Sequence, residues 1–426
     1  MSQAFFLRPS SALVFRSGRP FGAGESGGQD AGHEFPLPGT VAGALRAAWY
    51  DLDGRPVASA DLRNDSMHLG VRGPIRCTRR HDKLTLWLQR PGDLAAVRRD
   101  GTQEIIRLQP DAAGAHACDL PFGLHPLVSP HEPGQLEDAD RLPAWCELNW
   151  LLQWMSRGVD RNPPKLQDTH RRVRLPADRR THAKLDADTL RVDEDGGLHQ
   201  SSGLEFLTAA SEATTEQGLL VWAETARPAT QTTLSRLHLR HARLGADGRT
   251  CVFLSEPQWD SGPAAALSGH GDLAKEIDAV VPGQHVRLLL LTPACYLRNG
   301  WYPDGLKPVT RADVAGEPQV RIEGSLVGLA DWKFRLVAAA VGRGIAHSTV
   351  ATSALPNTRH RARQRGGTGA WQDRISALHR LVPAGSVYWL EVLQMGAEPL
   401  SKRQWQPTCR FEFARDGHGL GLFGIA

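Results

Sequence analysis

The chain has 426 residues, of which 41% are hydrophobic and 23% are charged, and its formal net charge is +4 at pH 7. These values are typical of a globular protein, and the length favours two domains of about 200 residues over one small core. No segment approaches the roughly 18–20 apolar residues of a membrane helix, and the N-terminal residues lack the pattern of a signal peptide. We therefore expect a cytoplasmic protein that has no membrane partner.

The six cysteines are dispersed, without the short spacings of a zinc site or a redox pair. Buried, reduced thiols are the expected state, and neither a metal ion nor a cofactor is predicted. The slightly basic balance gives only weak support for a nucleic-acid partner, so the clustering of the cations matters more than their total.

Residues 5–50 predict a strand, a long basic loop and a helix. Apolar residues at 5–7 and 13–15 indicate the strand, and the loop 16–32 that follows is rich in glycine and contains two arginines. Such a loop cannot bury a core, so its backbone amides stay available to a ligand, another chain or water. The cations and first glycines of this loop are Arg16, Gly18, Arg19, Gly22 and Gly24.

The helix is predicted to begin at Thr40 as N-cap, because apolar residues then recur at helical spacing. This apolar stripe consists of Val41, Ala44, Leu45, Ala48, Trp49 and Leu52. Gly43 and Arg46 lie off the stripe, and a glycine at such a position suggests that another group approaches the helix closely.

Strands alternate with turns over residues 67–110, and a helix is predicted over 145–155. Residues 159–184 are strongly basic, and short strands follow over 185–223. Later strands are predicted at 237–239, 251–254, 286–292, 334–340 and 387–392. The run of leucines at 288–291 predicts a central strand that is buried on both faces. Strands outnumber helices, so the predicted fold class is α+β.

Two arginine clusters could bind single-stranded nucleic acid, because guanidinium groups hold phosphates while aromatic rings stack on bases. The alternative is a solvated surface, which is the more frequent role of such charge runs. The first cluster contains Arg171, Arg172, Arg174, Arg179, Arg180 and Lys184, with His170 and His182. The second contains Arg359, Arg361, Arg363, Arg365, Arg374 and Arg380, with Trp371 among them.

The closing segment GHGLGLFG, at residues 417–424, resembles a phosphate-binding motif only in its glycines. A dinucleotide fingerprint needs a following helix, and a phosphate loop needs a following GK[ST], and neither is present. A structural turn and a loop that packs against a nucleic-acid backbone both remain open. No metalloprotease, hydrolase or two-metal nuclease motif occurs. His33 is the best candidate for a general acid or base, although a structural histidine is the commoner interpretation.

Taken together, the motifs resemble the third subunit of the Cmr complex, the type III-B CRISPR RNA-guided effector. The resemblance begins with FFLRPSSALVFRSGRPFGAGE and PLPGTVAGALRAAWYD. It continues through VRGPI, LQRPGDLAAV, RTHAKLDADTLRVDEDGGLHQSSGLEF, LLLLTPACYLRNGWYPDGL, LVPAGSVYWLE and RDGHGLGLFG. These blocks follow the family's order over nearly the whole chain. Two features depart from the family: residues 347–374 lack its GWD element, and His418 occupies a position where the family usually has phenylalanine.

The resemblance implies two ferredoxin-like (RRM-like) modules of the repeat-associated (RAMP) superfamily, with β-hairpin and loop insertions. We assign residues 1–225 to the first module, with a thumb-like hairpin insertion, and 226–426 to the second. The resemblance further implies a non-catalytic subunit that holds the 5′ repeat-derived tag of the guide RNA and meets target RNA indirectly. Its implied protein partners are the large polymerase-like subunit and the neighbouring RAMP backbone subunits.

Under this interpretation, the RNA strand is held by arginines and glycines from both ends of the chain. The residues expected to contact RNA are Arg8, Arg16, Gly18, Arg19, Gly22, Gly24, Arg46, Arg171, Arg172, Arg174, Arg179, Arg180, His182, Gly417, Gly419 and Gly421. Two alternatives remain. One is a metal-independent guide-processing endoribonuclease that uses His33, and the other is an assembly subunit whose arginines face protein carboxylates.

Overall fold

The structure is a computed structural model, and it describes the greater part of the chain. The described residues are 2–15, 33, 35–52, 68–99, 102–111, 120–130, 135–136, 142–158, 164, 175–183, 189, 191, 198–206, 215–225, 234–262, 271–312, 316, 318–349 and 377–426. Within them, strands predominate over a few short helices, which confirms the predicted mixture of α and β structure in its coarse form. No helix among them has the length and hydrophobicity needed to cross a bilayer.

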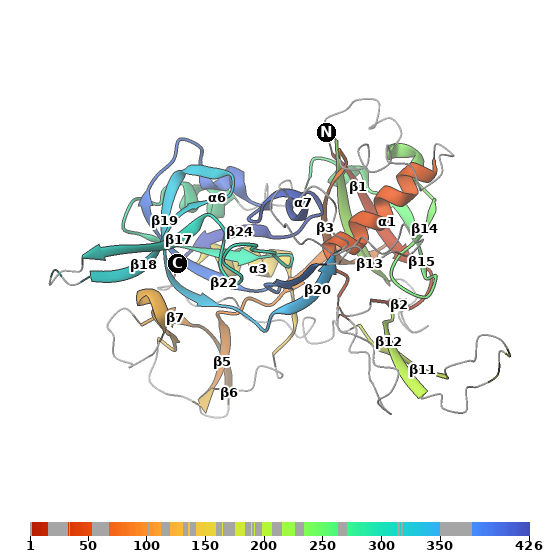
Figure 1. The fold of residues 1–426 in the computed structure, drawn as a ribbon, viewed down its shortest axis with the longest axis horizontal. Coiled ribbons are helices and arrows are strands. Elements are labelled where there is room, and N and C mark those ends of the chain that lie inside the picture. The colour runs from red at the N-terminus through yellow and green to blue at the C-terminus, as the bar shows by residue number, and fades with distance from the viewer. Residues whose placement is uncertain are drawn as a thin grey trace, which may run out of the picture.

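The first large sheet has seven antiparallel strands and occupies one half of the molecule (Figure 1). Across the sheet they are β10 (Trp145–Glu147), β4 (Lys83–Gln89), β3 (Gly70–Arg80), β13 (Thr215–Glu224), β1 (Ser2–Pro9), β15 (Thr250–Ser255) and β14 (His241–Arg243). The predicted module boundary at residue 225 falls between β13 and β15, although both strands belong to this sheet.

The second large sheet also has seven antiparallel strands and occupies the other half (Figure 1). In order they are β17 (Leu306–Ala312), β18 (Pro318–Leu326), β19 (Leu329–Ala340), β22 (Val387–Gln394), β16 (His285–Leu290), β24 (Leu420–Ile425) and β23 (Gln406–Pro407). The leucine-rich β16 lies between β22 and β24, and its residues Val286 to Leu290 are buried. The prediction of a central buried strand is therefore confirmed.

Four small sheets extend from these halves. They are β11 (Ala177–Ala183) with β12 (Leu198–Leu204) and β2 (Leu13–Val14); β5 (Leu94–Arg99) with β6 (Thr102–Arg107) and β9 (Gln135–Leu136); β7 (Gln109–Pro110) with β8 (Leu127–Val128); and β20 (Ile345–Thr349) with β21 (Ala377–Leu381). The closing segment 417–424 is only partly the loop that the sequence predicts. Its last two glycines, Gly421 and Gly424, lie in strand β24 of the second large sheet.

Helix α1 (Pro38–Asp51) packs on one face of the first sheet. Its residues Val41 and Leu45 join a core with Phe5 and Leu7 of β1, as the predicted apolar stripe requires. The prediction of Thr40 as N-cap is wrong, because the helix begins at Pro38, whose fixed φ and missing N–H suit the first turn. At Gly43, no atom from another described part of the chain lies within 4 Å of a Cβ built there, so the close neighbour inferred from the sequence does not come from the described residues.

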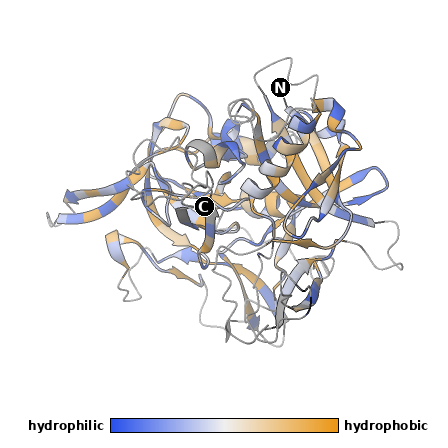
Figure 2. Ribbon diagram, turned by 45° about the vertical axis from the view of Figure 1, so that its right-hand side comes forward, coloured by the Kyte–Doolittle hydropathy of each residue, from blue (hydrophilic) through white to orange (hydrophobic). Residues whose placement is uncertain are grey.

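Helix α3 (Leu148–Ser156) joins the two halves. Its Trp154 lies in one continuous core with Trp222 of the first sheet and with Trp389 and Leu422 of the second. The helix also contacts α6 (Gly271–Asp278), which precedes the second sheet. Figure 2 shows hydrophobic residues concentrated on the central strands that face this core. The two halves are thus held together by apolar burial, which is the main favourable term in folding.

A buried ion pair adds a polar link to the same junction. Arg287 of β16 and Asp93, which precedes β5, are both fully buried, and Arg287 Nη1 lies 3.0 Å from Asp93 Oδ2. Arg287 also donates to the carbonyls of Trp154 at 2.8 Å and Ile425 at 2.8 Å. Arg107 of β6 donates to the same Trp154 carbonyl at 2.6 Å and packs over the Trp154 ring. Two arginines and one carboxylate therefore connect the β5–β6 hairpin, α3 and the second sheet.

Five of the six cysteines lie in the described residues, and all five are free and buried. Burial raises the pKa of the Cys146 and Cys251 thiols to about 12, so they remain protonated at neutral pH. These thiols behave as small core residues, as the sequence predicted. Cys118 lies outside the described residues.

Candidate nucleic-acid interface

The predicted hairpin is present and is tied to the start of the basic loop. Strands β11 and β12 pair in antiparallel register, with Arg179 opposite Ser202 and Arg180 opposite Ser201. On its other edge β12 pairs with β2, so that Gly203 is opposite both Asp178 and Val14. Two strand spacings of about 4.8 Å place Val14 roughly 10 Å from Asp178. The end of β2, from which the chain continues into loop 16–32, is therefore close to the part of β11 that carries Arg179 and Arg180.

Both hairpin arginines project from β11 into solvent. Arg180 is half exposed and donates through Nε to Asp178 Oδ2 at 2.8 Å. Arg179 is exposed and has no ion-pair partner among the described residues. His182 lies in the same strand, opposite His199. Figure 1 shows this hairpin extending away from the first sheet. Arg171, Arg172 and Arg174 lie outside the described residues.

Loop 16–32 lies outside the described residues, and with it Arg16, Gly18, Arg19, Gly22 and Gly24. Its two ends are nevertheless fixed. The backbone N–H of His33 donates to the carbonyl of Phe15 at 2.9 Å, so the chain departs and returns at one point. Whatever the path of the loop, its base lies beside the β11–β12–β2 sheet and beside a pocket between the two halves.

That pocket, which we call the inter-module pocket, has a volume of about 410 Å³. His33 and Phe35 line it from the end of the loop, Arg76 and Trp87 from the first sheet, and Arg343 from the segment between β19 and β20. Its described lining also includes Trp145, whose ring lies 5.0 Å from that of Phe35 and 5.1 Å from the Arg76 guanidinium carbon.

The chemistry of this pocket is cationic and aromatic. Burial lowers the pKa of Arg76 to about 10, so its guanidinium remains charged at neutral pH, and Arg343 is exposed at the rim. No carboxylate occurs among the described lining residues. Such a pocket suits an anionic ligand that carries a flat ring. Sequence reasoning missed Arg343 and Trp87, because only the tertiary fold brings β4 and residues 343–345 next to residue 33.

Arg8, expected to contact RNA, lies on β1 beside acidic residues. Its Nη1 is 3.2 Å from Glu216 Oε1, and its side chain is 45% exposed. Glu216 also accepts from Arg79, which lies over the ring of Phe6 at 4.5 Å and pairs with Glu256 at 3.0 Å. These hydrogen bonds lower the pKa of Glu216 despite the opposing effect of burial. Arg8 therefore belongs to a compensated charge network.

Arg46 is committed to contacts within the chain. Its Nη1 lies 2.5 Å from Asp416 Oδ1, and its Nε and Nη2 donate to the carbonyl of Leu69 at 3.2 and 2.9 Å. Only 13% of the side chain is exposed. Arg46 thus links α1 to the segment that precedes the closing glycines, and few of its donors remain for a phosphate.

The closing glycines are buried. Gly417 packs against Val71 and Gly73 of β3, and its N–H donates to Ala414 at 3.3 Å. The N–H of Gly419 donates to the carbonyl of Pro293 at 2.9 Å. Gly421 lies in β24, opposite Leu290 and Gln406. Gly417 allows the two halves to approach closely, whereas Gly419 and Gly421 pack against residues of the second half. Because all three are buried, we leave them and Arg46 out of the interface proposed below.

His418 lies between the closing glycines and helix α1. Its Nε2 accepts a hydrogen bond from Gly39 N–H at 3.3 Å, and its Nδ1 donates to the Pro293 carbonyl at 3.1 Å. The first turn of α1 has no side-chain cap of its own, so the imidazole satisfies one of its amides. The ring of His347 lies 6.0 Å away. Burial lowers the pKa of His418, and that of His347, to about 4.

We expect acid to destabilise the protein through His418. In the unfolded chain the histidine has a pKa near 6.5. Between about pH 6.5 and 4, His418 is therefore protonated in the unfolded chain but neutral in the folded chain. The contribution of His418 to the free energy of unfolding is therefore fully present above pH 6.5. It decreases as the pH is lowered toward 4, by about 3 kcal/mol at most. Urea unfolding across this range measures it. The His418→Phe variant should show a shallower dependence, and an identical slope would contradict the assignment.

No cluster of three or more His, Cys, Asp or Glu side chains in the described part of the chain could hold a metal ion. Most of the second basic cluster, with Trp371, also lies outside the described residues. Arg380 alone is described, exposed on β21.

Comparison with known proteins identifies the family. The family described as CRISPR-associated protein (Cas_Cmr3) matches residues 5–426. No curated protein matches the chain. The chain is similar to one in the cryo-EM structure of the Type III-B Cmr-beta bound to cognate target RNA, with a TM-score of 0.38 and 10% identity, covering 91% of this chain and 86% of that chain.

Similar values are found for Cmr-beta bound to cognate target RNA and AMPPnP, with a TM-score of 0.36, 12% identity and coverage of 91% and 86%. The Csm3–Csm4 subcomplex of the type III-A interference complex gives 0.32, 8% identity and coverage of 92% and 94%. Likenesses this distant carry no argument about function. The family match covers nearly the whole chain and agrees with the sequence motifs, so the protein belongs to the Cas_Cmr3 family of CRISPR-associated proteins, which are subunits of type III effector complexes.

Proposed function

We propose that this protein is a non-catalytic subunit of a type III-B effector that binds the 5′ repeat-derived tag of the guide RNA. The proposed interface consists of loop 16–32, the β11–β12 hairpin and the inter-module pocket. The observation that carries the proposal is the register of β11, β12 and β2, which brings Arg179 and Arg180 beside the base of the loop. The hairpin arginines therefore lie near the point at which the chain enters loop 16–32.

The chemistry of this surface favours a single strand. Exposed guanidinium groups on the hairpin, together with Arg16 and Arg19 in the loop, would neutralise phosphates without reading sequence. The inter-module pocket offers Phe35, Trp87 and Trp145 where an unstacked base could lie against a ring. A single strand is held by this combination of cations and stacking surfaces.

We also propose that each half is a ferredoxin-like module. In the first sheet the order β3–β13–β1–β15 is, numbered along the chain, 2-3-1-4. The order β19–β22–β16–β24 gives the same sequence in the second sheet. This is the order of a βαββαβ unit, with α1 as the first crossover helix of the first module. We place the module boundary between Ser255, where β15 ends, and His285, where β16 begins.

Charge reversal of the loop and hairpin is expected to abolish retention of the guide tag. The variants are Arg16→Glu with Arg19→Glu, and Arg179→Glu with Arg180→Glu. Each pair should weaken binding of tag RNA about tenfold or more at low salt, and the salt slope should fall by about 0.7 for each phosphate that is no longer neutralised. Fluorescence anisotropy with labelled tag RNA measures both quantities.

The matched control is Arg240→Glu with Arg243→Glu, which changes the same number of charges at exposed positions on or beside β14. If the control weakens RNA binding equally, the effect of the loop and hairpin variants would be due to net charge and not to a specific interface. Unchanged RNA binding in the loop and hairpin variants would remove both elements from the interface. It would favour the assembly-only alternative, in which the arginines contact the polymerase-like subunit or the backbone subunits.

A second candidate function is a metal-independent guide-processing endoribonuclease. One observation favours it: His33 lines a pocket that also contains Arg76 and Arg343, so an imidazole lies near cations that could hold a phosphate. Incubation of the purified chain with repeat RNA tests this function. Cleavage that disappears in His33→Ala would support the nuclease, and intact RNA would contradict it.

A further inference from the structure

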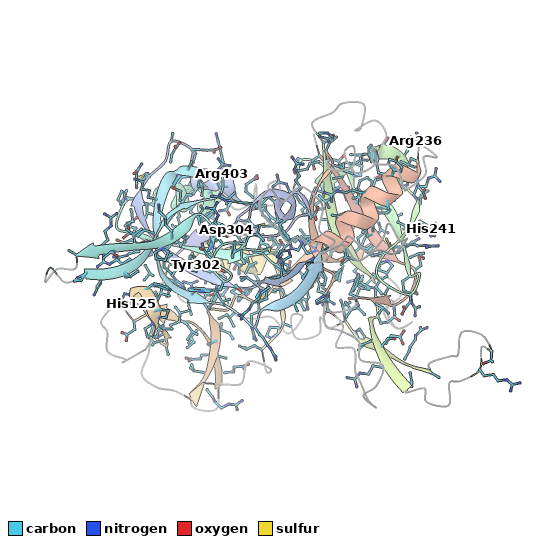
Figure 3. The ribbon with its side chains drawn as sticks, viewed as in Figure 1. His125, Arg236, His241, Tyr302, Asp304 and Arg403 are labelled. Atoms are coloured by element: carbon cyan, nitrogen blue, oxygen red, sulfur yellow. The ribbon has the colours of Figure 1, made fainter. Side chains whose placement is uncertain are left out.

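A groove on the second half of the molecule is distinct from the proposed RNA interface. It has a volume of about 1170 Å³ and is open to solvent along the second sheet. Its lining residues come mostly from β17, β18, β19, β22 and the segment from Arg403 to Ala414. Figure 3 shows Arg403 in the second half of the molecule and His241, on β14, in the first half. We call this site the C-terminal groove.

The C-terminal groove has an excess of positive charge. Its cationic lining residues are Lys307, Arg311, Lys333, Arg403 and Arg410, and Glu323 is the one carboxylate in the described lining. Glu323 forms an ion pair with Arg311, whose Nη2 and Nε lie 3.0 and 3.2 Å from Glu323 Oε2. Arg403 is paired with Glu398, which is not part of the lining.

Three of these cations are uncompensated. Lys307, Lys333 and Arg410 make no ion pair or side-chain hydrogen bond with any residue that the structure describes, and both lysines are exposed. Lys307 and Lys333 come from β17 and β19 of the second sheet, and Arg410 comes from the segment just before α7 (Phe411–Arg415). Like charges gathered around one concave surface raise the local concentration of an anionic partner.

Aliphatic side chains line part of the groove between the cations, together with the polar Ser325, Gln394 and Gln406. Val309, Leu326, Leu393 and Pro407 line the groove, and no aromatic side chain occurs among its described lining residues. Leu393 is 36% exposed, and Met395 beside it is 41% exposed. The inter-module pocket, in contrast, has three aromatic rings. Single-stranded RNA gains much of its affinity from stacking on aromatic rings, and the C-terminal groove offers none.

We propose that the C-terminal groove binds an acidic segment of a partner protein in which carboxylates alternate with aliphatic residues. The carboxylates would pair with Lys307, Lys333 and Arg410, while the aliphatic side chains cover Val309 and Leu393. Burial of apolar surface supplies the affinity, and the charges supply orientation and selectivity. This proposal does not depend on tag binding at the proposed RNA interface.

The test uses the purified full-length chain and three labelled probes of equal charge. They are a short peptide of alternating Glu and Leu, a peptide of alternating Glu and Ser, and an oligouridylate. The groove variant combines Lys307→Gln, Lys333→Glu and Arg410→Glu. These residues have no described partner, so their replacement leaves no buried group unsatisfied. The control combines Lys275→Gln, Arg240→Glu and Arg243→Glu, which makes the same change in net charge at exposed positions elsewhere.

We expect the Glu-Leu peptide to bind the native chain more tightly than the Glu-Ser peptide does. The groove variant should bind it at least about tenfold more weakly, and the control variant should bind it as the native chain does. Oligouridylate should bind the groove variant and the native chain equally and should not displace the peptide. Equal binding of the Glu-Leu peptide by groove and control variants overturns the proposal. Loss of oligouridylate binding in the groove variant also overturns it, because the groove would then be an RNA site.

Discussion

Replacement of Asp93 by alanine should lower the free energy of unfolding by about 3–5 kcal/mol, because it leaves the Arg287 guanidinium buried without a counter-charge. Both side chains are fully buried and lie 3.0 Å apart. Burial already lowers the pKa of Arg287, and Asp93 is the principal group that opposes this effect. Since domains are stable by only about 5–15 kcal/mol, this loss is a large fraction of the total. Urea unfolding followed by tryptophan fluorescence measures it.

Two controls accompany this prediction. Arg8→Ala removes an exposed ion pair with Glu216 and should cost less than about 1 kcal/mol. The double variant Asp93→Leu with Arg287→Met removes both buried charges and should be more stable than Asp93→Ala alone. It should not reach the native value, because Arg287 also donates to the Trp154 and Ile425 carbonyls. If Asp93→Ala is as stable as the native chain, the buried ion pair contributes nothing to the free energy of unfolding.

The Gly417→Ala variant should be destabilised by about 3 kcal/mol or more, because two penalties combine at this position. Its φ is +89°, a conformation that a residue with a Cβ rarely adopts. A Cβ there would lie 2.5 Å from the carbonyl oxygen of Gly73 and 2.9 Å from that of Val71. Neither backbone atom can rotate away, so the two halves must move apart. Calorimetry should show a lower melting temperature.

The matched control is Gly43→Ala in helix α1. No atom from another described part of the chain lies within 4 Å of a Cβ at Gly43, and an alanine inside a helix is favoured over glycine by about 1 kcal/mol. The same chemical change should therefore stabilise the protein at residue 43 and destabilise it at residue 417. Destabilisation of similar size at both positions would contradict the packing argument.

Elements whose structure depends on local pattern could be predicted from the sequence. The leucine run predicts β16 because a strand covered on both faces needs no polar alternation. The apolar stripe predicts α1 because helical spacing places those residues on one face. The start of α1 is not predicted correctly, since the rule favouring Thr40 competes with a proline two residues earlier. The glycine-rich segment 417–424 is predicted as a loop because glycine is common in loops. Part of it forms β24 because it pairs with β16, and this long-range pairing leaves no local signal in the sequence.

The site was less predictable than the fold, because the sequence shows where cations lie but not what they face. Arg46 looks like an RNA contact within its motif, yet its partner Asp416 is 370 residues away. Lys307, Lys333 and Arg410 are separated by long segments, so they form no charge cluster that a sequence could reveal. Arg179 and Arg180 can be identified because they are adjacent in the chain and lie on a hairpin whose motif is recognisable.

The pairing of β16 with β24 has a consequence for synthesis in the cell. Val286 pairs with Ile425, so one edge of the leucine-rich strand has no partner until residue 425 has left the ribosome. The first sheet can close much earlier, once residue 255 has emerged, because β15 completes its pairing with β1. Nascent chains stalled between these two points expose an adhesive apolar edge that favours aggregation. Slower translation during this interval should therefore lower the yield of folded protein, and chaperone capture should raise it.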